Sequence, residues 1–238
     1  MRHFGAAARR GRRAWTALVF AVALSGCFSV GTPEPSGTGV APGLFPRVAY
    51  SGFNPNAQFR ALFATSAAEP MWSVSDASIA TVVPSKAPAQ LKTEGLSFAL
   101  VTMTRAGETT VVVRSRTDPD AFVTARLVVK AYSDEALTLG KARYDTSPGD
   151  PARVACASCH AKPEGVDHSP LKMAGFDDAT ILGVIQEATY PPTPTGQAVA
   201  SDYAPKGPLS FPGHRWNLTD PEKDGILAHL RSLPLGGL

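Results

Sequence analysis

Cysteine is scarce in this chain of 238 residues, which holds three, and no apolar run is long enough to cross a bilayer. The apolar run Ala14–Leu24 has 11 residues, against the roughly 20 that a transmembrane helix needs. Residues 1–26 contain five arginines and no acidic residue. Removing these five from the 23 lysines and arginines leaves 18 basic against 20 acidic side chains. The remaining chain therefore lacks the basic excess of a nucleic-acid-binding protein.

The N-terminal segment 1–26 has the pattern of an export signal. Four arginines between positions 9 and 13 precede the apolar run, which ends in small residues. The end of this segment, Leu24-Ser-Gly-Cys27, resembles the lipobox of bacterial lipoproteins. The resemblance implies lipidation of Cys27, a membrane anchor and a periplasm-facing or surface position, and Phe28 in place of Asp favours the outer membrane. The alternative is an ordinary signal peptide in which this cysteine is incidental.

Composition divides the rest of the chain into three parts. Residues 27–43 are rich in Gly, Pro, Ser and Thr and predict a flexible tether after the lipidated cysteine. Residues 44–131 alternate apolar and polar side chains in short runs, which indicates strands. Residues 132–238 contain helical patterns together with the remaining two cysteines. We expect about seven strands in an antiparallel sandwich, with runs at 58–64, 71–74, 98–104, 109–114 and 122–130.

The strand region also carries a longer pattern. It reads Trp72-Ser-Val-Ser-Asp-Ala-Ser-Ile-Ala-Thr-Val82, followed by Ala106-Gly-Glu-Thr-Thr-Val-Val-Val113. This resembles the group 2 bacterial Ig-like domain, although residues 84–95 replace that family's short hairpin. The resemblance implies a spacer or a module that contacts a partner. We expect Trp72 to be a core aromatic residue, and the region holds no cysteine or histidine.

The chemistry-bearing motif is Cys156-Ala-Ser-Cys159-His160. A zinc site needs further soft ligands, and no other cysteine remains once Cys27 is lipidated. A redox pair of the thioredoxin type belongs to a βαβ setting, which the sequence does not show. The pattern C-x-x-C-H is typical of covalent c-type haem attachment, in which both thiols form thioethers and the histidine binds iron. Export fits this interpretation, because such haem is attached outside the cytoplasm.

The flanks of the motif resemble a class I mono-haem cytochrome c. Ser133–Tyr144 is similar to that family's first helix, in which Gly140 allows close crossing by the last helix. Thr219–Leu233 is similar to the final helix, with His229 as a packing residue between the two. The sequence therefore predicts a multidomain fold, an all-β Ig-like sandwich over 44–131 followed by an all-α cytochrome c domain over 132–238.

The same resemblance supplies further ligands of haem c. Pro170, in Ser169-Pro-Leu171, matches the position whose carbonyl accepts a hydrogen bond from the proximal imidazole. His214 stands where the family places its axial methionine, which implies two axial imidazoles, His160 and His214. The alternatives for the sixth position are Met173, which comes soon after the motif in the chain, or no ligand at all. His168 shares with Met173 a position close behind the proximal ligand.

Two residues next to His214, Arg215 and Trp216, are candidates for hydrogen bonds to the haem propionates, with surface charge and loop packing as the alternatives. Two axial imidazoles leave no open coordination position, so the predicted function is electron transfer to a redox partner rather than enzymatic catalysis. A haem-based gas sensor or haem enzyme with a dissociable distal ligand is one alternative. A surface-binding Ig-like lipoprotein with an accessory haem is the other.

Overall fold

The computed structural model describes residues 42–88, 95–118, 120–146, 155–160, 168–187 and 214–235. The predicted signal segment and the predicted lipidation site, Cys27, lie outside these residues, as does most of the tether. Gly37–Leu238 form one compact unit. Within the described ranges, no helix is both long enough and apolar enough to span a membrane.

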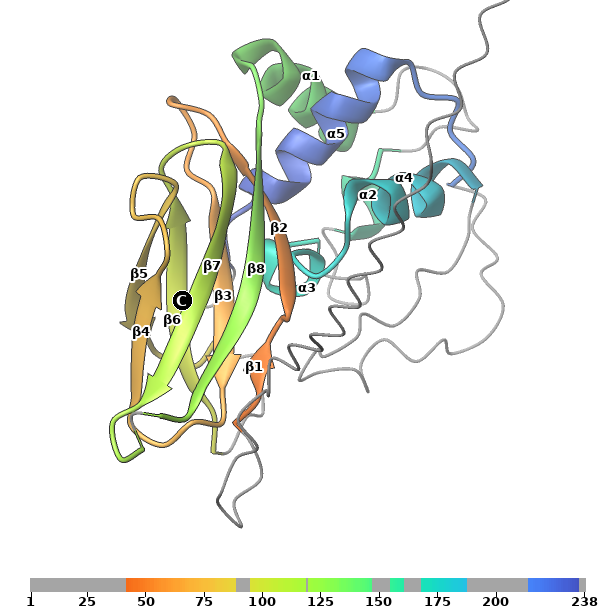
Figure 1. Ribbon diagram of the computed structural model, residues 1–238. Helices are drawn as coiled ribbons and strands as arrows, with labels where there is room; N and C mark the ends of the chain where they lie inside the picture. The colour runs from red at the N-terminus through yellow and green to blue at the C-terminus, as the bar shows by residue number, and fades with distance from the viewer. Residues whose placement is uncertain are drawn as a thin grey trace, which may run out of the picture. The chain divides into compact units, whose positions relative to one another are not determined.

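Eight strands form two four-stranded sheets (Figure 1). One sheet has the order β1-β3-β6-β5 and the other β2-β8-β7-β4. The strands are β1 Leu44–Phe45, β2 Val48–Phe53, β3 Arg60–Thr65, β4 Pro70–Val74, β5 Ala80–Ser85, β6 Ser97–Met103, β7 Gly107–Ser115 and β8 Phe122–Ala131.

Alternation of side chains explains how the strands make a core. Thr109, Val111 and Val113 of β7 are buried, and so are Ala125 and Leu127 of β8, while the residues between them are more exposed. Successive side chains of a strand point to opposite faces of a sheet, so one face of each strand enters the core. The five predicted strand runs coincide, apart from small differences at their ends, with β3, β4, β6, β7 and β8.

The expected all-antiparallel arrangement is wrong at one pair. Strands β2 and β8 pair in parallel, from Val48 opposite Arg126 to Phe53 opposite Ala131. All other strand pairs among the described residues are antiparallel. The parallel pair joins the beginning and the end of the strand region, so local alternation in the sequence does not reveal its direction.

Five helices follow the strands in the part of the chain that the structure describes. They are α1 Asp134–Asp145, α2 Ala157–His160, α3 Pro170–Met173, α4 Asp178–Glu187 and α5 Asp220–Ser232. Ser133 caps α1 by accepting the Ala136 N–H at 3.2 Å. A capping box opens α5, since the Thr219 N–H donates to the Glu222 carboxylate at 2.9 Å. The caps that the sequence predicts at Ser133 and Thr219 are therefore present.

Helices α1 and α5 cross at two glycines (Figure 1). A Cβ atom built on Gly140 would lie 1.8 Å from the Gly225 carbonyl oxygen, so only glycine allows the two backbones to approach this closely. The ring of Tyr144 in α1 packs against the ring of His229 in α5, with centroids 4.8 Å apart. Both features agree with the roles that the sequence suggests for Gly140 and His229.

The fold class predicted from the sequence is wrong. The described residues form two four-stranded sheets beside five helices of 4 to 13 residues, and no all-α domain of the cytochrome c kind is evident among them. Two of the helices, α2 and α3, are single turns. The helices also share a core with the sheets, since Tyr50 of β2 donates its N–H to the Ala174 carbonyl after α3 at 2.7 Å. Helical periodicity predicts where helices form, but it does not reveal what covers their apolar faces.

Candidate functional site

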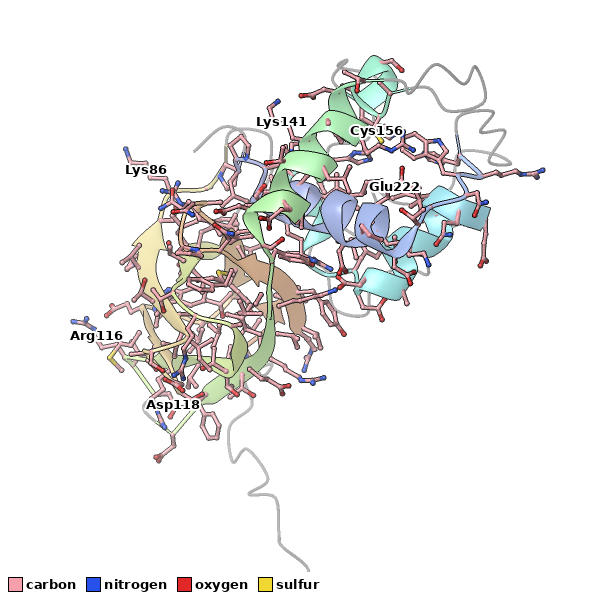
Figure 2. All side chains as sticks on the ribbon, turned by 90° about the horizontal axis from the view of Figure 1, so that it is seen from above. Lys86, Arg116, Asp118, Lys141, Cys156 and Glu222 are labelled. Carbon is pink, nitrogen blue, oxygen red and sulfur yellow. The ribbon has the colours of Figure 1, made fainter. Side chains whose placement is uncertain are left out.

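The motif Cys156–His160 forms a single helical turn around α2. The His160 N–H donates to the Cys156 carbonyl at 2.9 Å, and the Ser158 N–H donates to the Ala155 carbonyl at 3.0 Å. Residues four apart on a helix lie on the same face, so Cys156 and His160 are neighbours. Cys156 is half-buried against the core, and Figure 2 shows it among the helices. Cys159 belongs to the same turn.

Three histidines gather next to this turn. The rings of His160 and His214 are nearly parallel, at 7°, with centroids 6.1 Å apart, although the two histidines are distant in the sequence. The ring of His168 lies closer to His160, with centroids 3.7 Å apart and an angle of 27° between the planes. Tyr144 packs edge-on against His168 at 5.9 Å. The structure therefore brings together the two predicted axial ligands and adds a third imidazole beside them.

Burial lowers the pKa of His168, His214 and His229 and so favours their neutral form. Loss of solvent, together with the neighbouring His160, His214 and His229, lowers the pKa of His168 from its ordinary value of 6.5 to about 3. Burial and His160 lower the pKa of His214 to about 4. The pKa of His229 is also lowered, chiefly by burial. A neutral imidazole has a nitrogen lone pair available for a metal, whereas a protonated imidazole does not.

The segment after His214 is held against α4. The N–H groups of Arg215 and Trp216 both donate to the Ile185 carbonyl, at 2.8 and 3.1 Å. The Arg215 side chain is exposed, and its backbone has a φ of 96°. Trp216 is buried, and the Arg143 guanidinium lies 4.8 Å from its ring centroid. This contact favours a packing role for Trp216 over a hydrogen bond to a haem propionate.

Pro170 and Met173 lie in α3. Pro170 is buried at the start of the helix, and its carbonyl accepts the Ala174 N–H at 3.1 Å. A carbonyl oxygen has two lone pairs and can accept a second hydrogen bond. The hydrogen bond from the His160 imidazole to this oxygen stays a prediction. Met173 ends the helix and is partly buried against the core, as a flexible packing residue would be.

The residues present fit a haem with two axial imidazoles. No group of three or more histidine, cysteine, aspartate or glutamate side chains among the described residues is arranged to hold a metal ion. Axial ligation of haem needs only two imidazoles, because the porphyrin supplies the other four nitrogens. The His168 Nδ1 atom is buried and has no hydrogen-bond partner among the described residues. Ile181, Ile185 and Trp216 are buried in the same apolar cluster as Tyr144, whose ring contacts His168.

Sequence reasoning missed two contributors to this site. It gave His168 no role because this residue comes soon after His160 in the chain, yet the centroids of the two rings lie 3.7 Å apart. It did not consider Arg143, which helix α1 directs onto Trp216. The available signal was the clustering of all four histidines that follow Cys27, since the whole strand region 44–131 contains none of them.

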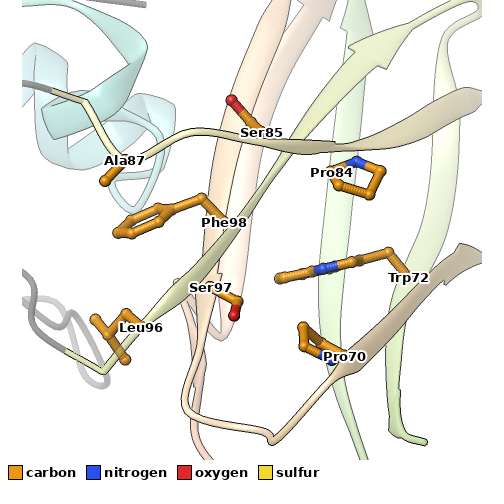
Figure 3. A pocket seen from close by; sticks show the side chains of 8 residues that line it. All are labelled: Pro70, Trp72, Pro84, Ser85, Ala87, Leu96, Ser97 and Phe98. Atoms are coloured by element: carbon orange, nitrogen blue, oxygen red, sulfur yellow. The ribbon is translucent and has the colours of Figure 1, made fainter.

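A separate groove of about 380 Å³ lies in the strand region (Figure 3). Trp72 lies in it between Pro70 and Pro84, and its indole also packs against the core. The sequence suggested the packing role alone. The groove carries no ionisable side chain and no histidine, so it offers no acid–base or metal chemistry. Its other lining residues are Ser85, Ala87, Leu96, Ser97 and Phe98.

No protein-family model and no curated protein matches this chain. Among solved structures, domains 1–6 of the surface layer protein SbsC match at 14% identity and a TM-score of 0.31, over 40% of this chain and 13% of that one. Domains 4 and 5 of SbsC match at 15% identity and a TM-score of 0.30, over 39% and 52%. The secreted serine protease VesC from Vibrio cholerae matches at 12% identity and a TM-score of 0.23, over 38% and 24%. Similarities at this level carry no argument about function.

Proposed function

We propose that this chain is an exported, lipid-anchored electron carrier with one covalently attached haem c. The observation that supports the proposal is the approach of His214 to His160 in the C-x-x-C-H turn, with nearly parallel rings 6.1 Å apart. Ring proximity between histidines so distant in the sequence adds a tertiary argument to a motif that is otherwise local. We assign thioether attachment to Cys156 and Cys159, and axial ligation to His160 and His214.

In this function the protein would hold and orient the haem and shield its ligands from water. When bound, haem supplies a one-electron couple. His160 and His214 would both bind the iron of that haem, which would leave no position for a substrate or a gas. Because the ligand set is then the same in both oxidation states, little rearrangement accompanies electron transfer. Tyr144 is buried against the rings of His168 and His229 and would limit the access of water to them.

The contact below His160 and the location of the chain belong to the same proposal. A Pro170 carbonyl that accepts the His160 imidazole N–H would fix the orientation of this ring. Residues 1–26 would direct export, and lipid on Cys27 would hold the mature protein at the periplasmic face or the surface of a bacterial outer membrane. We expect Cys27→Ala to move the protein from the membrane fraction to the soluble fraction without loss of haem. Retention in the membrane fraction would contradict the anchor.

The deciding experiment is a pair of optical spectra, oxidised and reduced, of residues 28–238 matured in a host that attaches haem c. We expect haem that resists acidic acetone extraction, a low-spin spectrum in both states and no response to carbon monoxide. The matched control is the double variant Cys156→Ser, Cys159→Ser, which should carry no covalent haem. Absence of covalent haem from the parent chain would refute the proposal.

Two further outcomes separate the alternatives. Rapid binding of carbon monoxide, or a high-spin resting state, contradicts the carrier and favours a gas sensor or haem enzyme. A methionine–iron charge-transfer band keeps the carrier but removes His214 from the iron in favour of Met173.

A further inference from the structure

Arg143 is an arginine buried beside the candidate haem site. It lies in helix α1 and is 7% exposed, and its guanidinium lies over the ring of Trp216 at 4.8 Å. Its Nε atom is 3.0 Å from Glu222 Oε1, which forms an ion pair between α1 and α5. Trp216 comes two positions after His214, the proposed distal ligand, in the chain.

The hydrogen-bonding capacity of Arg143 is not used up. Its Nη2 atom is buried and has no hydrogen-bond partner. A buried polar group without a partner destabilises the folded state, and does so more when the group is charged. Buried polar atoms of this kind are therefore few in native proteins and call for an explanation.

Arg231 is the other buried arginine of the described helices, and each of its three guanidinium nitrogens donates a hydrogen bond. It is 2% exposed. Its Nη1 donates to the Tyr50 carbonyl, its Nη2 to the Phe176 carbonyl and to Asp178, and its Nε to Asp178. Arg143 is also buried, but it has an unused N–H edge.

Glu222 does not satisfy that edge, because its carboxylate is shared. Its Oε2 atom accepts the N–H and the hydroxyl of Thr219, both at 2.9 Å, as part of the helix cap. Its Oε1 atom lies 3.0 Å from Arg143 Nε. A guanidinium presents N–H groups in a planar fork that matches a second carboxylate.

We infer that Arg143 binds a carboxylate at this site, and that the carboxylate is a propionate of the haem. The inference rests on the proposed function and goes beyond it. It moves the propionate contact from Arg215, whose side chain is exposed, to an arginine that the sequence did not single out. Trp216 then supports the guanidinium through its ring.

The test compares Arg143→Gln with two charge-removing variants, all in the haem-loaded mature protein. Lys141→Gln removes an exposed positive charge from the same helix, and Figure 2 shows this side chain pointing outward. Arg215→Gln removes the rival candidate. We expect Arg143→Gln to shift the propionate bending bands of the resonance Raman spectrum and to lower the reduction potential. Lys141→Gln and Arg215→Gln should leave the propionate bands unchanged.

Arg143→Lys guards against a general disturbance of the fold. It keeps the charge, so we expect it to restore most of the potential while the propionate bands stay shifted. Haem-loaded Arg143→Gln with parental bands and potential overturns the assignment, and so does a band shift in Arg215→Gln alone. Either result leaves the proposed function intact. A parent chain without covalent haem overturns both.

Discussion

Arg231 Nη1 donates a hydrogen bond of 2.7 Å to the carbonyl of Tyr50, a residue 181 positions earlier in the chain. The same guanidinium lies over the Tyr50 ring at 5.8 Å and pairs with Asp178 at 2.7 Å. One buried side chain of the last helix thus joins strand β2 to helix α4. Through this contact the sheets and the helices share one buried core.

We therefore expect the sheets and the helices to unfold together. Arg231→Met removes the donor to the buried Phe176 carbonyl, the partly buried Tyr50 carbonyl and the partly exposed Asp178 carboxylate. Leaving a buried acceptor without its hydrogen bond costs about 1–3 kcal/mol. The free energy of unfolding, measured in urea, should fall by that amount. In the parent protein the fluorescence of Trp72 in the strands and of Trp216 near the helices should change in one transition.

The control for this prediction is Arg116→Met. The Arg116 side chain is 71% exposed, and surface changes of this kind usually stay within about 0.5 kcal/mol. Equal losses in both variants would contradict a special role for Arg231.

The crossing of α1 and α5 makes Gly140 intolerant of any side chain. In Gly140→Ala the new Cβ would meet the Gly225 carbonyl oxygen at 1.8 Å, which is backbone and moves only if the helices separate. Overpacking typically costs about 1–3 kcal/mol, and we expect the upper end or more here. Thr138→Ala, an exposed change in the same helix, should leave the urea midpoint nearly unchanged. A stable Gly140→Ala protein would mean that the helices do not cross at this point.

The buried His168 predicts sensitivity to acid in the haem-free chain. Its pKa is about 3 in the folded state and 6.5 when exposed, so between these values the unfolded chain binds a proton that the folded chain does not. The free energy of unfolding then falls as the pH falls through this window, by about 1.4 kcal/mol per pH unit. We expect His168→Phe, in the Cys156→Ser, Cys159→Ser background, to have a shallower dependence between about pH 6 and pH 4 by roughly this slope. Identical slopes with and without His168 would contradict its burial.

The proposed axial pair predicts the effect of removing His214. In haem-loaded His214→Ala one coordination position should open, so the reduced protein should bind carbon monoxide while the parent does not. Met173→Leu is the control, because a packing methionine can be exchanged for leucine with little loss. Carbon monoxide binding by Met173→Leu and not by His214→Ala would assign the sixth position to methionine instead.

Much of the local structure could be predicted from the sequence. Apolar alternation located β7 and β8 because half-buried strands have a period of two. Ser133 and Thr219 marked the starts of α1 and α5, since their hydroxyl-bearing side chains satisfy the free N–H groups of a first turn. Gly140 indicated a close helix crossing. Each of these signals depends on neighbours in the chain or on one residue type.

The prediction of a separate all-α domain failed because the sequence pattern of a helix does not show which elements the helix contacts. The apolar stripe of α5 fits a helix that packs on another helix, and α5 does pack on α1. The same helix also carries Arg231, which reaches β2. Nothing in the periodicity of α5 separates a helix that contacts only helices from one that also contacts a sheet.

The sequence by itself determined the residue chemistry, namely a C-x-x-C-H turn, four histidines after Cys27 and the caps and alternations that start each element. Tertiary structure alone decided that His168 lies on His160, that β2 pairs with β8 in parallel, and that Arg143 is buried over Trp216 while Arg215 is exposed. The physical reason is the distance along the chain over which each interaction acts. Caps and strand alternation come from bonds between near neighbours, whereas burial and ring contacts depend on the path of the whole chain.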